Sequence, residues 1–569
     1  MADGQHLPID PFNARKCASG FCTPLADQRT QVVHIPPTEV IPIIFIPGIM
    51  GSNLRMSAKR QALLNKNNNI AWRVDSTYET ARFIKLTAGE RQKQLDPSET
   101  CVDTYDEGHS ETGNPSETPL KRNSGVTLKN VFQQHIPINF GVLLAPDPSG
   151  SKRRKTHLEK ALERGWGEIL FDSYGALLQL LERHMNEPMC SETELSEWWK
   201  NTIVEVNPKS WGNVLPQDLP LLNDTEIIAA LAKRWFPTHA MGYNWLESNS
   251  ISGIKLSERI SALISKYNNT VYKCEKVILI THSMGGLAAR AAMHPAIGKI
   301  EKSVHGVIHG AMPALGAGTA YKRMRCGFEG YSLSIVRNVL GATGAEVTSV
   351  LANAPGGLEL LPSKAYGNGW LQVIHENQLI LNLPQNGDPY SEIYKLKDKW
   401  FRLLKEEWIN PARLKKRNID RSFALLDEAK TFHEKLNEYF HPNSYAIYGA
   451  DRKKTAWGKV TWQLDFEVTP KENLDLCVSI DNGIGEIYFT HELALKKLST
   501  DLGPFKANLA TAQDPGDETV AICSSDSQMK FCKAVFRQTG YEHQESFKDE
   551  KSIAATFYSL IKIIQSIKR

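Results

Sequence analysis

The chain has 569 residues, more than one ordinary hydrophobic core organises, so its length predicts one large domain with insertions or two domains. Hydrophobic residues make up 41% and charged residues 23%, as in globular proteins, and no run of about 18 apolar residues indicates a membrane span. The 67 basic and 63 acidic side chains leave a formal charge of +4, which is too small to predict a nucleic-acid partner.

Short apolar runs alternate with helical patterns along much of the chain. A continuous apolar run at 40–46 predicts a strand buried on both faces, and apolar residues at helical spacing predict a helix at 168–186. The alternation continues with a strand near 237–245, a helix at 254–267, a strand at 277–281, a helix from 286 and a strand at 304–310. Such alternation is typical of a mostly parallel, doubly wound α/β sheet.

Longer segments interrupt this pattern. We expect an N-terminal arm at 1–36, a first part of the core at 37–313, polar insertions near 55–165 and 187–232, a mainly helical excursion at 314–442, and a second part of the core at 443–569. An excursion of more than 100 residues is too long for a loop, so the segment 314–442 predicts a cap domain.

The segment VILITHSMGG (277–286) places Ser283 between a predicted strand and a predicted helix. A serine on such a sharp turn projects its hydroxyl clear of the sheet, and the N–H groups at the start of the helix point toward an attacked carbonyl. The turn requires small residues two positions away on either side. Gly285 meets this requirement, whereas Thr281 stands where the G-x-S-x-G pattern has glycine. The alternative interpretation is that Ser283 only caps the helix.

Two further motifs offer groups that assist a serine nucleophile. PGIMGS (47–52) follows the first strong strand, and the backbone N–H groups of Ile49 and Met284 are candidates for stabilising an oxyanion. The turn DPGDETV (514–520) offers Asp517 as the acid that orients an imidazole. Asp451 is the alternative acid, because it directly follows a predicted strand.

The base is expected in GYEH (540–543), between the last predicted strand and the closing helix. A serine hydroxyl is a poor nucleophile until an imidazole within hydrogen-bond reach takes its proton. His543 gives the chain order Ser…Asp…His of α/β-hydrolases, and His441 and His491 are the alternatives.

Five motifs occur in one order across most of the chain: PGIMGSNL (47–54), AMGYNWLESN (240–249), THSMGGLAAR (281–290), GDETV (516–520) and GYEH (540–543). Together they resemble the branch of α/β-hydrolase lipases that holds lecithin:cholesterol acyltransferase and the GPI inositol-deacylases. The resemblance implies an α/β-hydrolase fold with a lid in the cap. It also implies the site residues Ser283 as nucleophile, Asp517 as acid, His543 as base, and Ile49 with Met284 as oxyanion donors.

A narrower resemblance rests on the segments 354–362 and 387–394 and on the start MADGQHLPIDPFNARK, which lacks the apolar core of a signal peptide. These features are similar to bacterial type VI secretion lipase effectors. The resemblance implies an antibacterial toxin made in the cytoplasm, carried by the secretion apparatus, and acting on phospholipid in the periplasm of a target cell. It further implies contact of the cap with the membrane and an immunity protein that covers the site.

We therefore predict a serine-dependent carboxylic-ester hydrolase of the lipase or phospholipase A type, which acts on membrane phospholipid through an acyl-enzyme intermediate. The alternatives are an intracellular esterase on soluble esters, an acyltransferase, and a non-catalytic binding module with a vestigial elbow. No cysteine and histidine set has zinc-site spacing, so we predict no metal and no cofactor. The sequence leaves open the calcium requirement, the lipid headgroup, the acyl position and the resting state of the lid.

Overall fold

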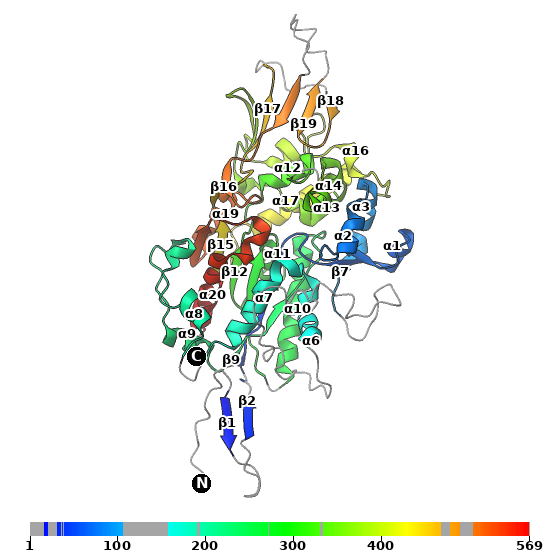
Figure 1. Ribbon diagram of the computed structural model, residues 1–569. Helices are drawn as coiled ribbons and strands as arrows, with labels where there is room; N and C mark the ends of the chain where they lie inside the picture. Colours follow the sequence, from blue (N-terminus) through cyan, green and yellow to red (C-terminus); the bar gives the residue numbers. More distant parts are fainter. Residues whose placement is uncertain are drawn as a thin grey trace, which may run out of the picture.

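A computed structural model describes residues 16–20, 31–35, 37, 39–105, 157–190, 194–270, 272–330, 334–467, 478–489 and 505–567. A seven-stranded sheet lies at its centre (Figure 1). In spatial order its strands are β10 (Thr238–Ala240), β4 (Ile43–Ile46), β11 (Val277–His282), β12 (Val304–Gly310), β15 (Ser444–Gly449), β22 (Ala534–Gln538) and β8 (Asn213–Leu215). Every neighbouring pair is parallel except β22 with β8, so the predicted mostly parallel sheet is confirmed.

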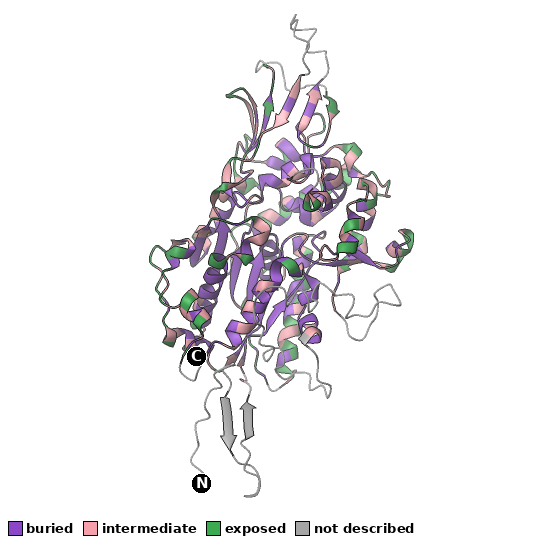
Figure 2. Cartoon of the chain, viewed as in Figure 1, coloured by how far each residue is buried: buried purple, intermediate pink, exposed green. Residues whose placement is uncertain are grey.

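Both faces of this sheet are covered, which explains the continuous apolar character of its strands. Along β11 the side chains alternate between two hydrophobic clusters, with Leu279 in one and Ile278 and Ile280 in the other. Helices α10 (Asn249–Asn268) and α11 (Gly285–Met293) contribute to the first cluster, and α7 (Phe171–Asn186) and α20 (Glu550–Gln565) to the second. Figure 2 shows the buried residues concentrated in these layers.

The strand predicted at 40–46 is divided into β3 (Glu39–Val40) and β4. Pro42 lies at the division and has no N–H to donate to a neighbouring strand, although its carbonyl accepts a hydrogen bond from Ile278 N at 2.9 Å. The short β3 pairs instead with β9 (Arg234–Trp235).

The segments predicted as polar insertions contain regular structure. The first holds the sheet of β5 (Leu54–Met56), β6 (Ile70–Trp72) and β7 (Thr100–Val102), with α1 (Ala58–Leu63), α2 (Thr77–Phe83), α3 (Ala88–Gln94) and, later, α6 (His157–Glu163). Residues 106–156 of that insertion lie outside the described residues. The second holds α8 (Glu197–Thr202) and α9 (Asp224–Leu231), and it supplies β8 to the central sheet.

The segment 314–442 contains the expected helices and also a β-hairpin. The helices are α12 (Gly318–Cys326), α13 (Ile335–Leu340), α14 (Gly344–Leu351), α15 (Pro355–Leu358), α16 (Glu406–Ile409) and α17 (Ile419–Leu436). The hairpin of β13 (Leu371–His375) and β14 (Gln378–Leu383) joins β17 (Val460–Leu464), β20 (Lys506–Leu509), β19 (Glu486–Phe489) and β18 (Val478–Asp481) in a six-stranded sheet. Strands from beyond residue 443 thus complete a sheet that begins within 314–442.

The remaining strands form two small pairs, β1 (Lys16–Gly20) with β2 (Gln31–Ile35) and β16 (Asp451–Ala456) with β21 (Asp514–Gly516). A short helix, α19 (Ile522–Ser525), follows β21. Within the described ranges, no helix has both the length and the apolar character needed to cross a membrane.

Candidate active site

Ser283 lies on the sharp turn between β11 and α11, with a φ of 51° and only 4% of its surface exposed. A positive φ at a residue other than glycine is strained and is characteristic of a nucleophile elbow. A Cβ atom at Gly285 would lie 2.3 Å from the carbonyl oxygen of Pro47, so this position requires glycine. At Thr281, where the pattern has glycine, the hydroxyl lies 3.1 Å from Nδ1 of His309 on β12. The buried threonine hydroxyl therefore has a polar partner.

The structure brings the three residues predicted as nucleophile, acid and base into one hydrogen-bonded row. Nε2 of His543 lies 2.8 Å from Oγ of Ser283, and Nδ1 of His543 lies 2.8 Å from Oδ2 of Asp517. The other carboxylate oxygen of Asp517 accepts the backbone N–H groups of Thr519 at 3.1 Å and Val520 at 2.7 Å. With an acceptor on Nδ1, the imidazole carries its proton there and presents a lone pair to the serine hydroxyl.

The alternative acid and bases have other contacts. Asp451 accepts the backbone N–H groups of Gly540 at 2.9 Å and Lys453 at 2.7 Å, and so stabilises the turn that precedes His543. His441 accepts the N–H of Asn443 at 3.1 Å, and His491 lies outside the described residues. Asp451 pairs with Gly516 in the β16–β21 ladder, which explains why both aspartates were reasonable candidates.

The loop that carries Ile49 passes directly over the elbow. A Cβ atom at Gly48 would lie 2.9 Å from Nδ1 of His282 and 3.0 Å from Cβ of Ser283, so glycine permits this close approach. Met284 is the N-cap residue of α11. Among the described residues, neither the N–H of Ile49 nor that of Met284 has a hydrogen-bond acceptor, so both donors are available to a ligand.

His282 and Tyr174 also belong to this site, although sequence reasoning missed them. Nε2 of the buried His282 lies 2.9 Å from the backbone oxygen of His543, and Nδ1 lies 2.9 Å from the hydroxyl of Tyr174. Burial, followed by the charge of the nearby His543, lowers the pKa of His282 to about 3. The position of His282 beside the nucleophile is its only sequence signal, and Tyr174 is more than 100 residues away in α7.

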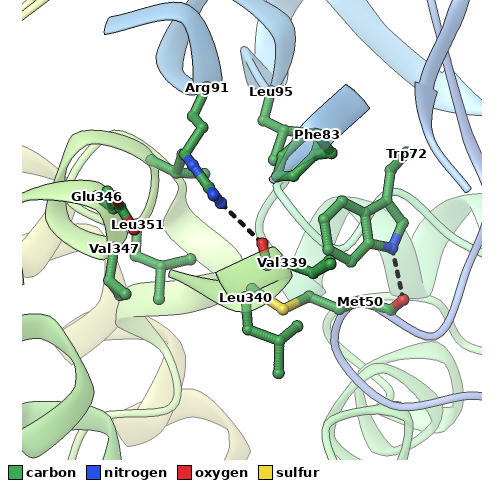
Figure 3. A pocket seen from close by; sticks show the side chains of 11 residues that line it. Met50, Trp72, Phe83, Arg91, Leu95, Val339, Leu340, Glu346, Val347 and Leu351 are labelled. Atoms are coloured by element: carbon green, nitrogen blue, oxygen red, sulfur yellow. Dashed lines mark hydrogen bonds between the residues drawn. The ribbon is translucent and has the colours of Figure 1, made fainter. Parts of the chain in front are cut away.

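A small, mainly apolar pocket opens beside the residue that follows Ile49 (Figure 3). Its lining comprises Met50, Trp72, Phe83, Arg91 and Leu95 from the core and its first insertion, and Val339, Leu340, Glu346, Val347, Val350 and Leu351 from α13 and α14. Trp72 Nε1 donates to the carbonyl of Met50 at 2.8 Å, which ties the pocket wall to the oxyanion loop. The pocket therefore lies between the loop that carries Ile49 and helices α13 and α14.

Arg91 connects the two walls of this pocket. Its guanidinium donates to the carbonyl oxygen of Val339 at 2.7 Å and lies 4.8 Å from the ring centroid of Phe83 (Figure 3). It also donates to the carbonyl oxygen of Asn338 at 2.6 Å, in the last turn of α13. Burial lowers the pKa of Arg91 from the ordinary arginine value.

In the described part of the chain, no group of three or more histidine, cysteine, aspartate or glutamate side chains is placed to hold a metal ion.

The family model described as "PGAP1-like alpha/beta domain" matches residues 254–326, from α10 through the elbow to the end of α12. Among solved structures, the chain is similar to one described as "The crystal structure of Tle4-Tli4 complex", with 29% sequence identity and a TM-score of 0.71. That alignment covers 94% of this chain and 100% of the other. No curated protein matches the chain.

Proposed function

We propose that this chain, an α/β-hydrolase lipase of the PGAP1-like branch, hydrolyses the acyl esters of membrane phospholipids. The proposal depends above all on the 2.8 Å contact between His543 Nε2 and Ser283 Oγ, with Asp517 bound to the far side of the imidazole. This arrangement raises the nucleophilicity of one buried serine hydroxyl.

The reaction proceeds in two steps, acylation of Ser283 and hydrolysis of the acyl-enzyme. Ser283 Oγ attacks the ester carbonyl while His543 takes its proton, and Asp517 stabilises the imidazolium. The N–H groups of Ile49 and Met284 bind the oxygen that becomes negative, and each such donor contributes roughly 3 kcal/mol to the transition state. Collapse forms the acyl-enzyme and breaks the bond to the lysophospholipid oxygen, which takes the proton from His543. Water then repeats these steps and releases the fatty acid.

The pocket beside Met50 is the proposed site for the acyl chain. Its walls are mainly aliphatic and aromatic, and each methylene buried there contributes about 0.8 kcal/mol to binding. On α13, at the cap side of the pocket, Ile335 and Val336 are 63% and 66% exposed. This apolar surface supports peripheral contact between the cap and a lipid bilayer.

The similarity to the Tle4-Tli4 structure supports a role as a type VI secretion effector with an immunity partner, since that structure is a complex and the similarity extends over 94% of this chain. In the proposed role, the secretion apparatus carries the protein out of the producing cell. It then acts on phospholipid in the periplasm of the target cell, and a dedicated immunity protein in the producing cell covers its site.

Fatty-acid release from phosphatidylethanolamine and phosphatidylglycerol vesicles tests the proposed activity. We expect release by the wild type and by Asp427→Asn, a matched control whose carboxylate forms an exposed ion pair with Lys395, and none by Ser283→Ala. Hydrolysis of short-chain soluble esters that vesicles do not enhance would instead indicate an intracellular esterase. Transfer of the acyl group to an added alcohol in preference to water would indicate an acyltransferase. A fluorophosphonate that leaves Ser283 unlabelled would indicate a non-catalytic module.

Toxicity in a bacterial host tests the proposed role. Wild-type protein directed to the periplasm is expected to arrest growth, whereas Ser283→Ala is not, and a co-produced immunity protein is expected to restore growth. Arrest that persists in Ser283→Ala would contradict toxicity by lipid hydrolysis.

A further inference from the structure

We propose that His282 and Tyr174 are positioning residues of this reaction. Together they form an uncharged hydrogen-bonded pair that fixes the loop that carries His543 and the loop that carries Ile49 relative to Ser283. The inference rests on the proposed function and adds two residues to it. Both residues are buried, and their polar side-chain atoms have partners within the protein.

The partners of His282 determine where its proton lies. The backbone oxygen of His543 can only accept, so His282 Nε2, at 2.9 Å, carries the proton and donates it. Nδ1 is then a lone-pair acceptor, and the Tyr174 hydroxyl at 2.9 Å donates to it. Burial keeps both groups in these forms, because it lowers the pKa of His282 to about 3 and raises that of Tyr174 to about 12.

The other side of the Tyr174 oxygen faces the oxyanion loop. The backbone N of Gly48 lies 3.5 Å from this oxygen, and a Cβ atom at Gly51 would lie 3.1 Å from it. The Tyr174 ring is fixed from behind by Phe45 on β4, with ring centroids 4.7 Å apart. The hydroxyl therefore lies between the loop that carries Ile49 and the side chain next to Ser283.

His543 needs this additional support because it begins the short 3₁₀ helix η10 (His543–Lys548) instead of lying on a long element. Asp517 fixes the imidazole through Nδ1 and the backbone N–H, which donates to the Asp517 carbonyl at 2.9 Å. His282 fixes the remaining backbone group, the carbonyl of His543. Loss of that donor leaves Nε2 of His543 free to drift from Ser283, and displacements of this kind lower kcat.

Replacements that mimic one ring nitrogen at a time separate positioning from packing. In His282→Gln the side-chain amide reaches the position of Nε2 and retains a donor toward the His543 carbonyl. In His282→Asn the shorter amide reaches only the position of Nδ1, so that donor is lost. Tyr174→Phe removes the hydroxyl and retains the ring that packs on Phe45.

The test measures kcat and KM on p-nitrophenyl butyrate with full-length protein, corrected for the fraction of Ser283 that a fluorophosphonate labels at saturation. We expect kcat to fall by about tenfold or more in His282→Asn and about threefold or more in Tyr174→Phe, with KM within twofold. His282→Gln is expected to recover most of the activity lost in His282→Asn.

Two results would overturn the inference. One is wild-type kcat in both His282→Asn and Tyr174→Phe. The other is an equal fall in His282→Gln and His282→Asn, which would indicate packing alone; if His282→Asn does not fold, Tyr174→Phe decides the question. A wild type that hydrolyses neither p-nitrophenyl butyrate nor phospholipid vesicles would refute the proposed function itself, so the two failures are distinguishable.

Discussion

Replacement of Asp517 by asparagine is predicted to abolish the base function of His543 without a change in side-chain shape. One carboxylate oxygen of Asp517 accepts two backbone N–H groups, from Thr519 and Val520, and the other faces His543 Nδ1 at 2.8 Å. In Asp517→Asn the amide oxygen must occupy the first position, because two donors point there. The amide NH₂ must then face Nδ1 and donate to it.

The reversed hydrogen bond moves the imidazole proton to Nε2, where it points at Ser283 and blocks proton abstraction. The expected loss in kcat is on the order of 10³- to 10⁴-fold, as is typical of a triad held in the wrong tautomer. Asp427→Asn is the matched control, and its kcat is expected to stay within about twofold because Asp427 forms an exposed ion pair with Lys395. The kcat of both variants is measured with p-nitrophenyl butyrate as the substrate. Equal effects of the two substitutions, or a loss below about tenfold in Asp517→Asn, would refute the reasoning.

Three further predictions concern the elbow, the cap and the attachment of the cap to the core. Thr281→Gly restores the G-x-S-x-G pattern but removes the hydroxyl at His309, so we expect no gain in kcat and a loss of about 1–2 kcal/mol in the free energy of unfolding, measured with urea. Arg91→Met removes two hydrogen bonds to the carbonyl end of α13, so limited proteolysis is expected to cut near residues 327–341 faster than in the wild type, and unchanged cleavage would contradict this role. Burial raises the pKa of Glu359 to about 7, and its carboxyl contacts Ser248 and Asn249 at the start of α10. Because the folded-state pKa of Glu359 is above its unfolded value, the stabilisation by the protonated carboxyl is complete below about pH 4.5 and is lost as the pH rises through 7. Relative to Glu359→Gln, the wild type is expected to lose roughly 3 kcal/mol of unfolding free energy between pH 5 and 8, and parallel profiles would contradict the shift.

Local sequence patterns predict the central layers of this fold well. The apolar runs at 277–281 and 304–310 become β11 and β12, since a strand buried on both faces needs no polar alternation. The predicted α/β-hydrolase fold is confirmed by the parallel sheet together with the structural similarity to a solved relative. The prediction of a serine lipase is confirmed by the match to the PGAP1-like alpha/beta domain and by the similarity to the Tle4-Tli4 structure.

Long-range pairing explains what the sequence could not predict. Strand β8 has only three residues and joins the sheet antiparallel to β22, more than 300 residues away. The six-stranded sheet likewise pairs β13 with β17 across about 90 residues, so neither partner carries a local signal of the other.

Some residues of the candidate site have a local sequence signal, whereas others are brought together only by the tertiary structure. Ser283 follows from its strand, turn and helix. The ladder places Asp451 opposite Gly516, next to Asp517, and only the contact with His543 distinguishes the two aspartates. Tyr174 reads as one more apolar residue of α7, because only the tertiary structure brings its hydroxyl to His282. The roles assigned to these residues stay predictions until variants are measured.

The most direct measurement of the central claim is the rate at which a fluorophosphonate labels Ser283, followed by peptide mass spectrometry, in the wild type and in His543→Gln. The 2.8 Å contact between the imidazole and the hydroxyl predicts a label on Ser283 in the wild type and a labelling rate reduced by at least about 100-fold in the variant. Label on another residue, or equal rates in the two proteins, would contradict the proposed activation of Ser283 by His543.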